Sequence, residues 1–489
     1  MSMHADEDSD EVVVPRKRSN KEDLSSAEIV EGRASPKGNG GQATAVRTPS
    51  RGIASSRLEA VRQAARQSRD VRFTALLHHI TIDLLKQSYA ALQRDAAPGI
   101  DGVTWRAYGE NLEAKLTVLH ERIHKGSYRA RPAKRSYIPK ADGSKRPLSI
   151  WCLEDKIVQQ AVVSVLEAIY EQDFVGFSYG FRPGRGQHDA LDALQAGIYR
   201  RRVSWVLDAD IRGFFDAMAH SWIIRFLEHR IADKRILRLI AKWLKVGIVE
   251  DGRRTRGTCG APQGAVISPI LANVYLHYVF DLWVHRWRRT KASGDVIVIR
   301  YADDTIVGFQ HEHEARVFLD DLKERMRAFE LALHPDKTKQ RMERGEGKPE
   351  TFDFLGFTHF CTRSRKWGSF VIGRKTIKKR MVRKLQAIKM ELRRRMHDPI
   401  AKTGAWVAQM LKGHLNYYAV SGNAPSLWWF VAEVRWRWLK TLKRRSQRAF
   451  LHGDEFTSMT NPFFPPIKIL HPQHLHRFDA RTRGRSPVR

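Results

Sequence analysis

Hydrophobic and polar positions along this chain follow two periods, and each change of period marks a change of element. Apolar residues spaced three or four apart predict helices over residues 75–92, 105–125, 154–170, 189–199 and 270–283. Short β-branched runs predict strands over 203–211 and on both sides of residues 303–304. Residues 137–150 predict a hairpin closed by Asp142-Gly143. Because strands and helices are interleaved, we expect a mixed α+β fold.

Composition divides the chain into four regions. Residues 1–69 are rich in charge, Ser, Gly and Pro, which predicts a disordered extension. Residues 70–359 carry the mixed pattern. Residues 360–450 are basic, with 23 Lys and Arg against three acids over 361–450, and their pattern predicts an all-helical domain. Residues 451–489 form a Pro- and His-rich tail.

The charge balance points to a polyanionic partner. The chain has 489 residues, with 86 Lys and Arg against 53 Asp and Glu, a net charge of +33. Nucleic acid fits this excess, because each neutralised phosphate releases counterions; an anionic membrane surface is the alternative. No apolar run reaches the roughly 18 residues of a transmembrane helix, so no membrane is expected. The three cysteines are far apart, which fits a reducing cytoplasm.

Two adjacent carboxylates, Asp303 and Asp304, lie between two apolar β-type runs. Like charges on a short turn repel each other, and a hard cation such as Mg²⁺ is the usual reason to hold them together. A solvated turn is the plainer interpretation. A second strand supports the metal interpretation, because it ends in Asp208 and Asp210. We expect Asp210 to act with the pair in phosphoryl transfer and Asp208 to be structural.

Two further segments could bind a nucleotide. Residues 257–269 form a Gly-rich loop in which Gln263 could hydrogen-bond a base or sugar, although a plain loop leading into a helix would look the same. On the predicted hairpin, Lys140 and Arg146 suit a triphosphate, although a solvated hairpin edge also carries such residues.

In this order, the motifs resemble the reverse transcriptase/maturase family encoded by bacterial group II introns. The resemblance covers nearly everything from about residue 70 onwards. Its motifs lie at residues 97–105, 137–161, 179–186, 205–216, 257–269, 301–304, 352–357 and 411–418. It implies a right-hand polymerase, with fingers and an antiparallel-sheet palm over 70–359 and an all-α thumb and maturase domain after it.

The resemblance also implies roles for single residues. Asp210, Asp303, Asp304 and the carbonyl of Ile211 would hold two Mg²⁺ ions, for which Mn²⁺ could substitute. Phe215 would exclude the ribose 2′-hydroxyl.

Further contacts follow from the same resemblance. Lys140, Arg146 and Gln263 would bind the deoxynucleoside triphosphate. Arg182, Gly184 and Lys337 would lie along the template and primer, with Lys337 equally readable as a surface lysine.

The implied activity is RNA-directed DNA synthesis on an RNA template with a DNA primer. The chain would also bind its group II intron RNA as a maturase, assisting splicing and retrohoming into target DNA. It would act in the bacterial cytoplasm near the nucleoid, as a monomer or a homodimer. The alternatives are a host-recruited reverse transcriptase in phage defence or DNA repair, and a splicing-only RNA-binding maturase.

Three details qualify the resemblance. The tail has no paired cysteines, so a metal-dependent endonuclease domain is not expected. Residues 149–151 read Ser-Ile-Trp where the family usually has Gly-Ile-Pro. In the basic region we expect the tryptophans in the core and the Lys and Arg side chains on the RNA. These tryptophans are Trp406, Trp428, Trp429, Trp436 and Trp438.

Overall fold

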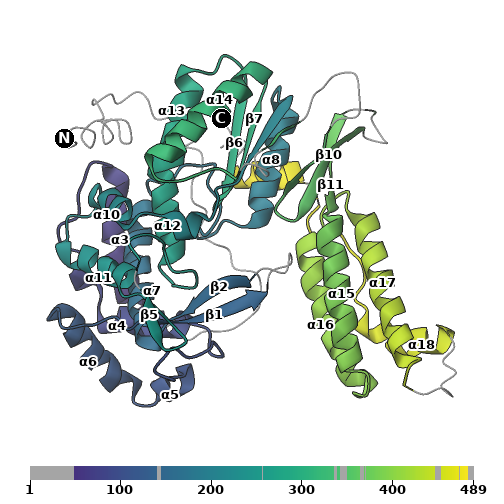
Figure 1. Ribbon diagram of the computed structural model, residues 1–489, viewed down its shortest axis with the longest axis horizontal. Coiled ribbons are helices and arrows are strands. Elements are labelled where there is room, and N and C mark those ends of the chain that lie inside the picture. Colours follow the sequence, from purple (N-terminus) through teal and green to yellow (C-terminus); the bar gives the residue numbers. More distant parts are fainter. Residues whose placement is uncertain are drawn as a thin grey trace.

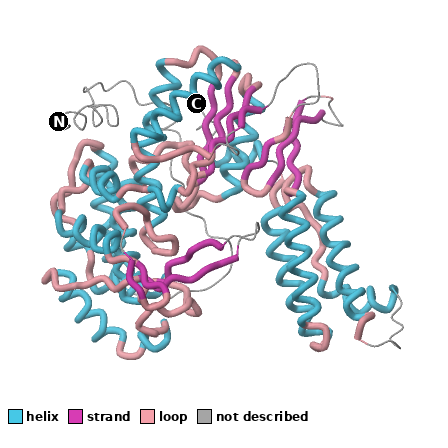
Figure 2. Tube along the Cα trace, in the orientation of Figure 1, coloured by secondary structure: helices cyan, strands magenta, loops and turns pink. Residues whose placement is uncertain are grey.

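The chain folds into a mixed α/β structure with three small sheets, as the computed structural model in Figure 1 shows. Strands and helices are interleaved along the chain (Figure 2), which confirms the expected mixture. The structure describes residues 49–139, 145–255, 257–334, 339–341, 350–363, 368, 370–445, 453–472 and 474–482.

An N-terminal group of helices packs around one long buried helix, α7. The helices of this group are α3 (Pro49–Gln67), α4 (Ile82–Ala91), α5 (Trp105–Gly109), α6 (Leu112–His124), α7 (Leu153–Tyr170), α10 (His220–Glu228), α11 (Lys234–Lys245) and α12 (Ser268–Leu276). The single helix expected over 105–125 is two helices, because Asn111 has a left-handed backbone with φ of 56°. Helix α7 has apolar residues on nearly every side and is buried almost throughout.

The prediction of disorder up to residue 69 is wrong for its last third. Residues 49–67 form helix α3, which packs against α7. Val61 and Ala65 lie four residues apart on one face and are buried in the main core, and Leu58 packs beside them. A narrow apolar stripe therefore holds helix α3 against the main core, although the overall composition of the segment is polar.

A four-stranded sheet extends from the helical group. Its order is β2-β1-β4-β5, with β1 (Ala133–Pro139), β2 (Lys145–Ile150), β4 (Ile248–Glu250) and β5 (Arg253–Thr255). Strands β1 and β2 pair antiparallel, which confirms the expected hairpin. Its closing residues, Lys140 among them, lie outside the described residues, as does the side chain of Arg146.

The central sheet has the order β6-β7-β3-β8, and all its neighbours are antiparallel. Its strands are β3 (Trp205–Ala209), β6 (Val296–Tyr301), β7 (Asp304–Phe309) and β8 (Lys339–Arg341). Helix α8 (Gln187–Arg200) covers one face, and α13 (Leu282–Thr290) and α14 (Glu312–Ala328) cover the other (Figure 1). Because both faces are buried, Ile297 and Val298 both join cores, which explains the continuous apolar run of β6.

The C-terminal region begins with a third sheet and continues as a helical bundle. The strands are β9 (Phe352–Phe354), β10 (Phe357–Arg363) and β11 (Phe370–Thr376), in the order β11-β10-β9. The bundle contains α15 (Lys378–Arg394), α16 (Ile400–Tyr418), α17 (Ala424–Leu442) and α18 (Gly453–Thr460). The expectation of an all-helical region from residue 360 is therefore wrong, because strands continue to Thr376.

The tryptophans of the bundle divide between core and surface. Trp438 is 1% exposed and packs on Phe456, as expected. Trp428, Trp429 and Trp436 are 62%, 43% and 53% exposed, so the expectation that they are core residues is wrong.

The last described helix, α19 (His474–Thr482), returns from the bundle to α8 (Figure 1). Phe478 is buried in the core that α8 shares with the central sheet. The guanidinium of Arg477 donates to both carboxylate oxygens of Asp192 on α8, and Arg200 pairs with Asp479.

Candidate catalytic site

The register of the central sheet brings Asp210 beside Asp304. Ala209, the last residue of β3, pairs with Thr305 on β7. Asp210 directly follows the end of β3, at the same edge of the sheet as Asp304, the first residue of β7. Residues opposite one another in an antiparallel pair have Cβ atoms about 5 Å apart and share a face. The two carboxylates therefore start from neighbouring backbone positions, although 94 residues separate them in sequence.

Asp303 lies in the tight connection that precedes β7. Tyr301 pairs with Asp304, so only Ala302 and Asp303 form the loop between β6 and β7, here called the catalytic hairpin. Ala302 has φ of 57° and is 7% exposed, a left-handed backbone unusual for a residue with a side chain. Asp303 is half-buried and Asp304 is exposed.

The side chains themselves do not form a ligand cage. Within the described residues, no three His, Cys, Asp or Glu side chains are grouped closely enough to hold a metal ion. The backbone brings the three carboxylates to one edge of the central sheet.

Phe215 lies close to this edge. Gly213, with φ of 57°, begins the short helix α9 (Phe214–Ala217) just after β3. The ring of Phe215 is half-buried and contacts the ring of Phe181 edge to face, with centroids 6.4 Å apart. Phe181 has φ of 59° and is 48% exposed. Phe181 was not identified from the sequence, because its contact joins distant loops.

The Gln263 loop docks on both the β1–β2 hairpin and the Phe215 segment. The carbonyl of Gln263 accepts a hydrogen bond from the backbone N–H of Ser149 on β2, at 2.6 Å. The N–H of Ala261 donates to the carbonyl of Phe215, at 2.8 Å. The side-chain amide of Gln263 donates to Asp216, at 3.4 Å. The structure thus brings Gln263, Phe215 and the base of the hairpin together.

Arg182 does not face a template groove. It is 6% exposed, and its guanidinium donates to Glu171 and to the carbonyls of Val175 and Ser178. The interpretation of Arg182 as a template contact is therefore wrong, because its donors are used inside the protein. Gly184 lies in the exposed part of the same loop with φ of 72°. Lys337 lies outside the described residues.

The C-terminal bundle approaches the catalytic hairpin through α16. The hydroxyl of Tyr417 donates to the carbonyl of Leu355, between β9 and β10, at 2.8 Å. Burial, with a contribution from the charge of Asp304, raises the pKa of Tyr417 to about 12. A pocket of about 600 Å³ opens between α15 and α16 beside this tyrosine, and its lining includes Arg380, Lys384 and Trp406.

The comparisons with known proteins identify the class. Residues 138–359 match the family model described as reverse transcriptase (RNA-dependent DNA polymerase). These residues include β2, the Gln263 loop and all three predicted metal ligands. The chain therefore contains a reverse transcriptase domain.

The relatives of the chain include proteins encoded by introns. The chain is 38% identical to Protein YkfC of Escherichia coli over 202 residues, which are 40% of this chain and 53% of that protein. It is 33% identical to the group II intron-encoded protein LtrA of Lactococcus lactis over 222 residues, 45% of this chain and 37% of LtrA. The putative COX1/OXI3 intron 2 protein of Saccharomyces cerevisiae is 36% identical over 162 residues, 33% of this chain and 19% of that protein. The chain is thus similar to these proteins over part of its length, and it aligns with about half or less of each relative's own length.

No helix in the described part of the chain has both the length and the apolar character needed to cross a membrane.

Proposed function

We propose that this chain is an RNA-directed DNA polymerase that also binds group II intron RNA as a maturase. The N-terminal helices and the β1–β2 hairpin serve as fingers, the central sheet as palm and the C-terminal bundle as thumb. The observation that carries the proposal is the register that sets Asp210 beside Asp304 within a reverse transcriptase domain.

Asp210, Asp303, Asp304 and the carbonyl of Ile211 would hold two Mg²⁺ ions, with Mn²⁺ as a substitute. The donors are all oxygens, which suits a hard cation. When bound, the ions activate the primer 3′-hydroxyl and stabilise the triphosphate. The exposed position of Asp304 and the half-buried positions of its neighbours leave this edge open to a nucleic acid.

The nucleotide is selected opposite this edge. Phe215 would stack under the sugar and exclude a 2′-hydroxyl, with Phe181 supporting its ring. Gln263 is held close to the same place through Ser149 and can contact the incoming nucleotide. Lys140 and Arg146 would bind the triphosphate.

The C-terminal bundle would bind RNA through its surface. Its charge is strongly positive, and phosphate contacts give affinity without sequence preference. Trp429 and Trp436 are seven residues apart on α17, so they lie on one helix face, where both are exposed. The ammonium of Lys440 lies 4.7 Å from the centre of the Trp436 ring. Exposed aromatic rings among cations are typical of surfaces on which unpaired bases stack.

Primer extension tests the activity. Purified full-length chain is given an RNA template, a DNA primer, deoxynucleotides and Mg²⁺, and DNA product is measured. Asp303→Asn should abolish synthesis, while Asp208→Asn, on the same strand as Asp210 but two residues earlier, should retain it. No product with the wild-type chain, or equal product from Asp303→Asn, would refute the polymerase.

The maturase role needs a separate measurement. Filter binding to structured intron RNA should weaken in a Trp429→Ala, Trp436→Ala double variant whose DNA synthesis on a simple template is unchanged. Retained splicing of a cognate intron in that variant would contradict the proposed RNA surface. Splicing, and insertion of the intron into target DNA, are measured in separate reactions that contain the intron RNA.

A further inference from the structure

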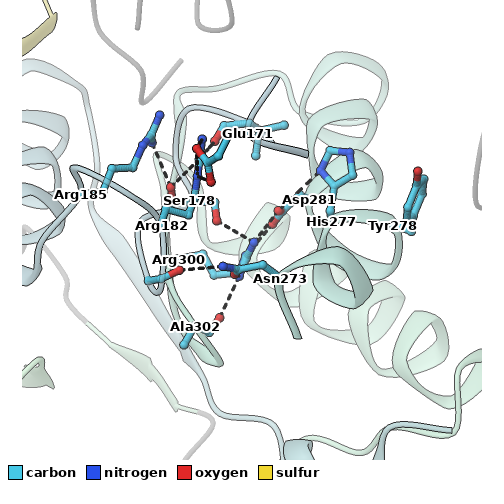
Figure 3. A network of polar contacts seen from close by, with 12 residues as sticks. Glu171, Ser178, Arg182, Arg185, Asn273, His277, Tyr278, Asp281, Arg300 and Ala302 are labelled. Carbon is cyan, nitrogen blue, oxygen red and sulfur yellow. Dashed lines mark hydrogen bonds and ion pairs between the residues drawn. The ribbon is translucent and has the colours of Figure 1, made fainter. Parts of the chain in front are cut away.

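Behind the catalytic hairpin lies a buried arginine, Arg300, with every donor of its side chain in use (Figure 3). The guanidinium makes a two-pronged ion pair with Asp281, at 2.7 and 2.6 Å. It also donates to the Asn273 side chain at 3.1 Å, the Ser178 hydroxyl at 2.7 Å and the carbonyl of Ala302 at 3.0 Å. An arginine has five N–H groups, and these five bonds use them all.

These partners come from three separate parts of the chain. Asn273 belongs to α12, and Asp281 ends the π-helical turn His277–Asp281 that follows it. Ser178 directly precedes residues 179–186, which resemble a template-gripping motif; residues 177–186 are here called the template loop. Ala302 belongs to the catalytic hairpin. Arg300, Asp281 and Ser178 are all fully buried. A buried charge of this kind is retained only when it is completely paired.

The network joins the template loop to the hairpin twice. The backbone of residue 300 pairs with the loop, because Tyr179 N–H donates to its carbonyl and its own N–H donates to Phe177. The side chain adds a second link, in which Asn273 accepts from Arg300 and donates to the carbonyl of Gly180 at 2.8 Å. Arg182 also donates to the carbonyl of Ser178, so this residue is held by both Arg182 and Arg300 (Figure 3).

The bond to Ala302 falls where the hairpin is strained. Ala302 has a left-handed backbone, which costs a residue with a side chain of order 1 kcal/mol and persists only where the surroundings impose it. The guanidinium fixes the carbonyl of Ala302, directly before Asp303. The direction of the next peptide, and with it the positions of Asp303 and Asp304, therefore depends on this contact.

We infer that Arg300 is a positioning residue for DNA synthesis, locking the Asp303-Asp304 turn in register with the template loop. This inference rests on the proposed polymerase. It assigns to Arg300 no contact with substrate or metal; its effect passes through the Ala302 carbonyl and through Asn273. Template placement and metal-ligand placement are then set by one rigid unit.

Arg300→Lys tests the inference. Lysine keeps a positive charge beside Asp281, but its single nitrogen cannot replace a planar fork that reaches Ala302, Asn273 and Ser178 together. A displacement of about 1 Å can cost about 100-fold in rate, so we expect kcat to fall 10- to 100-fold. The Mg²⁺ concentration for half-maximal rate should rise severalfold, whereas the affinity for the RNA–DNA duplex stays within about twofold.

The matched control is Arg325→Lys. Arg325 is also buried, and it donates to the carbonyls of Tyr278 and Val279 in the same π-helical turn, away from the catalytic hairpin. Its Mg²⁺ dependence should equal that of the wild type. Rates are divided by the active-site concentration from a burst measurement, so that a smaller folded fraction cannot imitate the effect.

A second variant covers the case in which Arg300→Lys does not fold. Asn273→Ala cuts the side-chain link to Gly180 and leaves the Arg300–Asp281 pair intact, and it should shift kcat and the Mg²⁺ requirement in the same direction. The inference is overturned if the foldable variants have wild-type Mg²⁺ dependence and kcat within twofold. Absence of DNA synthesis by the wild-type chain would instead refute the polymerase itself.

Discussion

Gly180 lies against the catalytic hairpin with no room for a side chain. A Cβ added to Gly180 would lie 2.2 Å from the backbone nitrogen of Ala302 and 2.9 Å from the carbonyl carbon of Tyr301. Ordinary contacts begin near 3.4 Å, and both neighbours are backbone atoms that cannot rotate away. Gly180→Ala must therefore push the template loop and the hairpin apart by roughly 1 Å.

The expected effect on catalysis exceeds the effect on folding. Overpacking of this kind costs about 1–3 kcal/mol of stability, whereas about 1 Å of misplacement costs about 100-fold in rate. We expect single-nucleotide primer extension by Gly180→Ala to slow by about two orders of magnitude per folded active site. Urea denaturation measured in parallel gives the folded fraction.

Gly186→Ala provides the control within the same loop. An added Cβ at Gly186 would meet only the Asp189 carboxylate, at 3.7 Å, and its φ of −119° suits any residue. Its rate per folded active site should stay within about twofold of wild type, because the added Cβ meets no backbone atom, although alanine is a poorer helix N-cap than glycine and costs about 1 kcal/mol of stability. Wild-type rate and stability in Gly180→Ala would refute the close contact on which the reasoning depends. Equal losses in both variants would show that the effect does not come from the contact between Gly180 and Ala302.

Three further predictions concern selectivity and stability. Phe215→Ala should raise the use of ribonucleotides relative to deoxynucleotides by about tenfold or more in competitive primer extension, and an unchanged ratio would remove its assigned role. Trp438→Ala should lower the free energy of unfolding of the C-terminal bundle by about 3–5 kcal/mol in urea, and a loss under about 1 kcal/mol would contradict its core position. Burial lowers the pKa of His414 to about 4, so this imidazole stays neutral in the fold. Its contribution to stability should be complete above about pH 6.5 and fall as the pH drops toward 4, because the unfolded chain then binds the extra proton. A His414→Phe variant with the same acid sensitivity would contradict that origin.

The strand ends could be placed from the sequence because local patterns define them. β-Branched runs flank Asp303 and Asp304, and Asp210 follows another such run, so sheet formation alone brings the three to strand ends. The directions of arginine side chains could not be obtained in the same way. In the sequence, Arg182 and Arg300 look like surface cations. In the structure they form buried ion pairs with Glu171 and Asp281. Only tertiary packing supplies those partners.

The predicted disorder up to residue 69 and the predicted all-helical region from residue 360 were both based on composition averaged over long windows. The apolar stripe of α3 is too sparse to change the polar average of residues 1–69. Strand β11 carries Arg374 and Lys375 among its apolar residues, so it looks like the basic helices that follow. Trp429 and Trp436 were assigned to the core because large aromatic residues are usually buried, and the structure leaves them on the surface.

Helix α19 gives the C-terminal bundle a second attachment. The first is covalent, where β11 leads into α15; the second is the ionic and aromatic docking of Arg477 and Phe478 on α8. A lobe anchored at both ends can pivot about the line between its anchors but cannot swing away freely. If the proposed polymerase holds its duplex between the bundle and the central sheet, helix α19 would limit how far these two parts can separate.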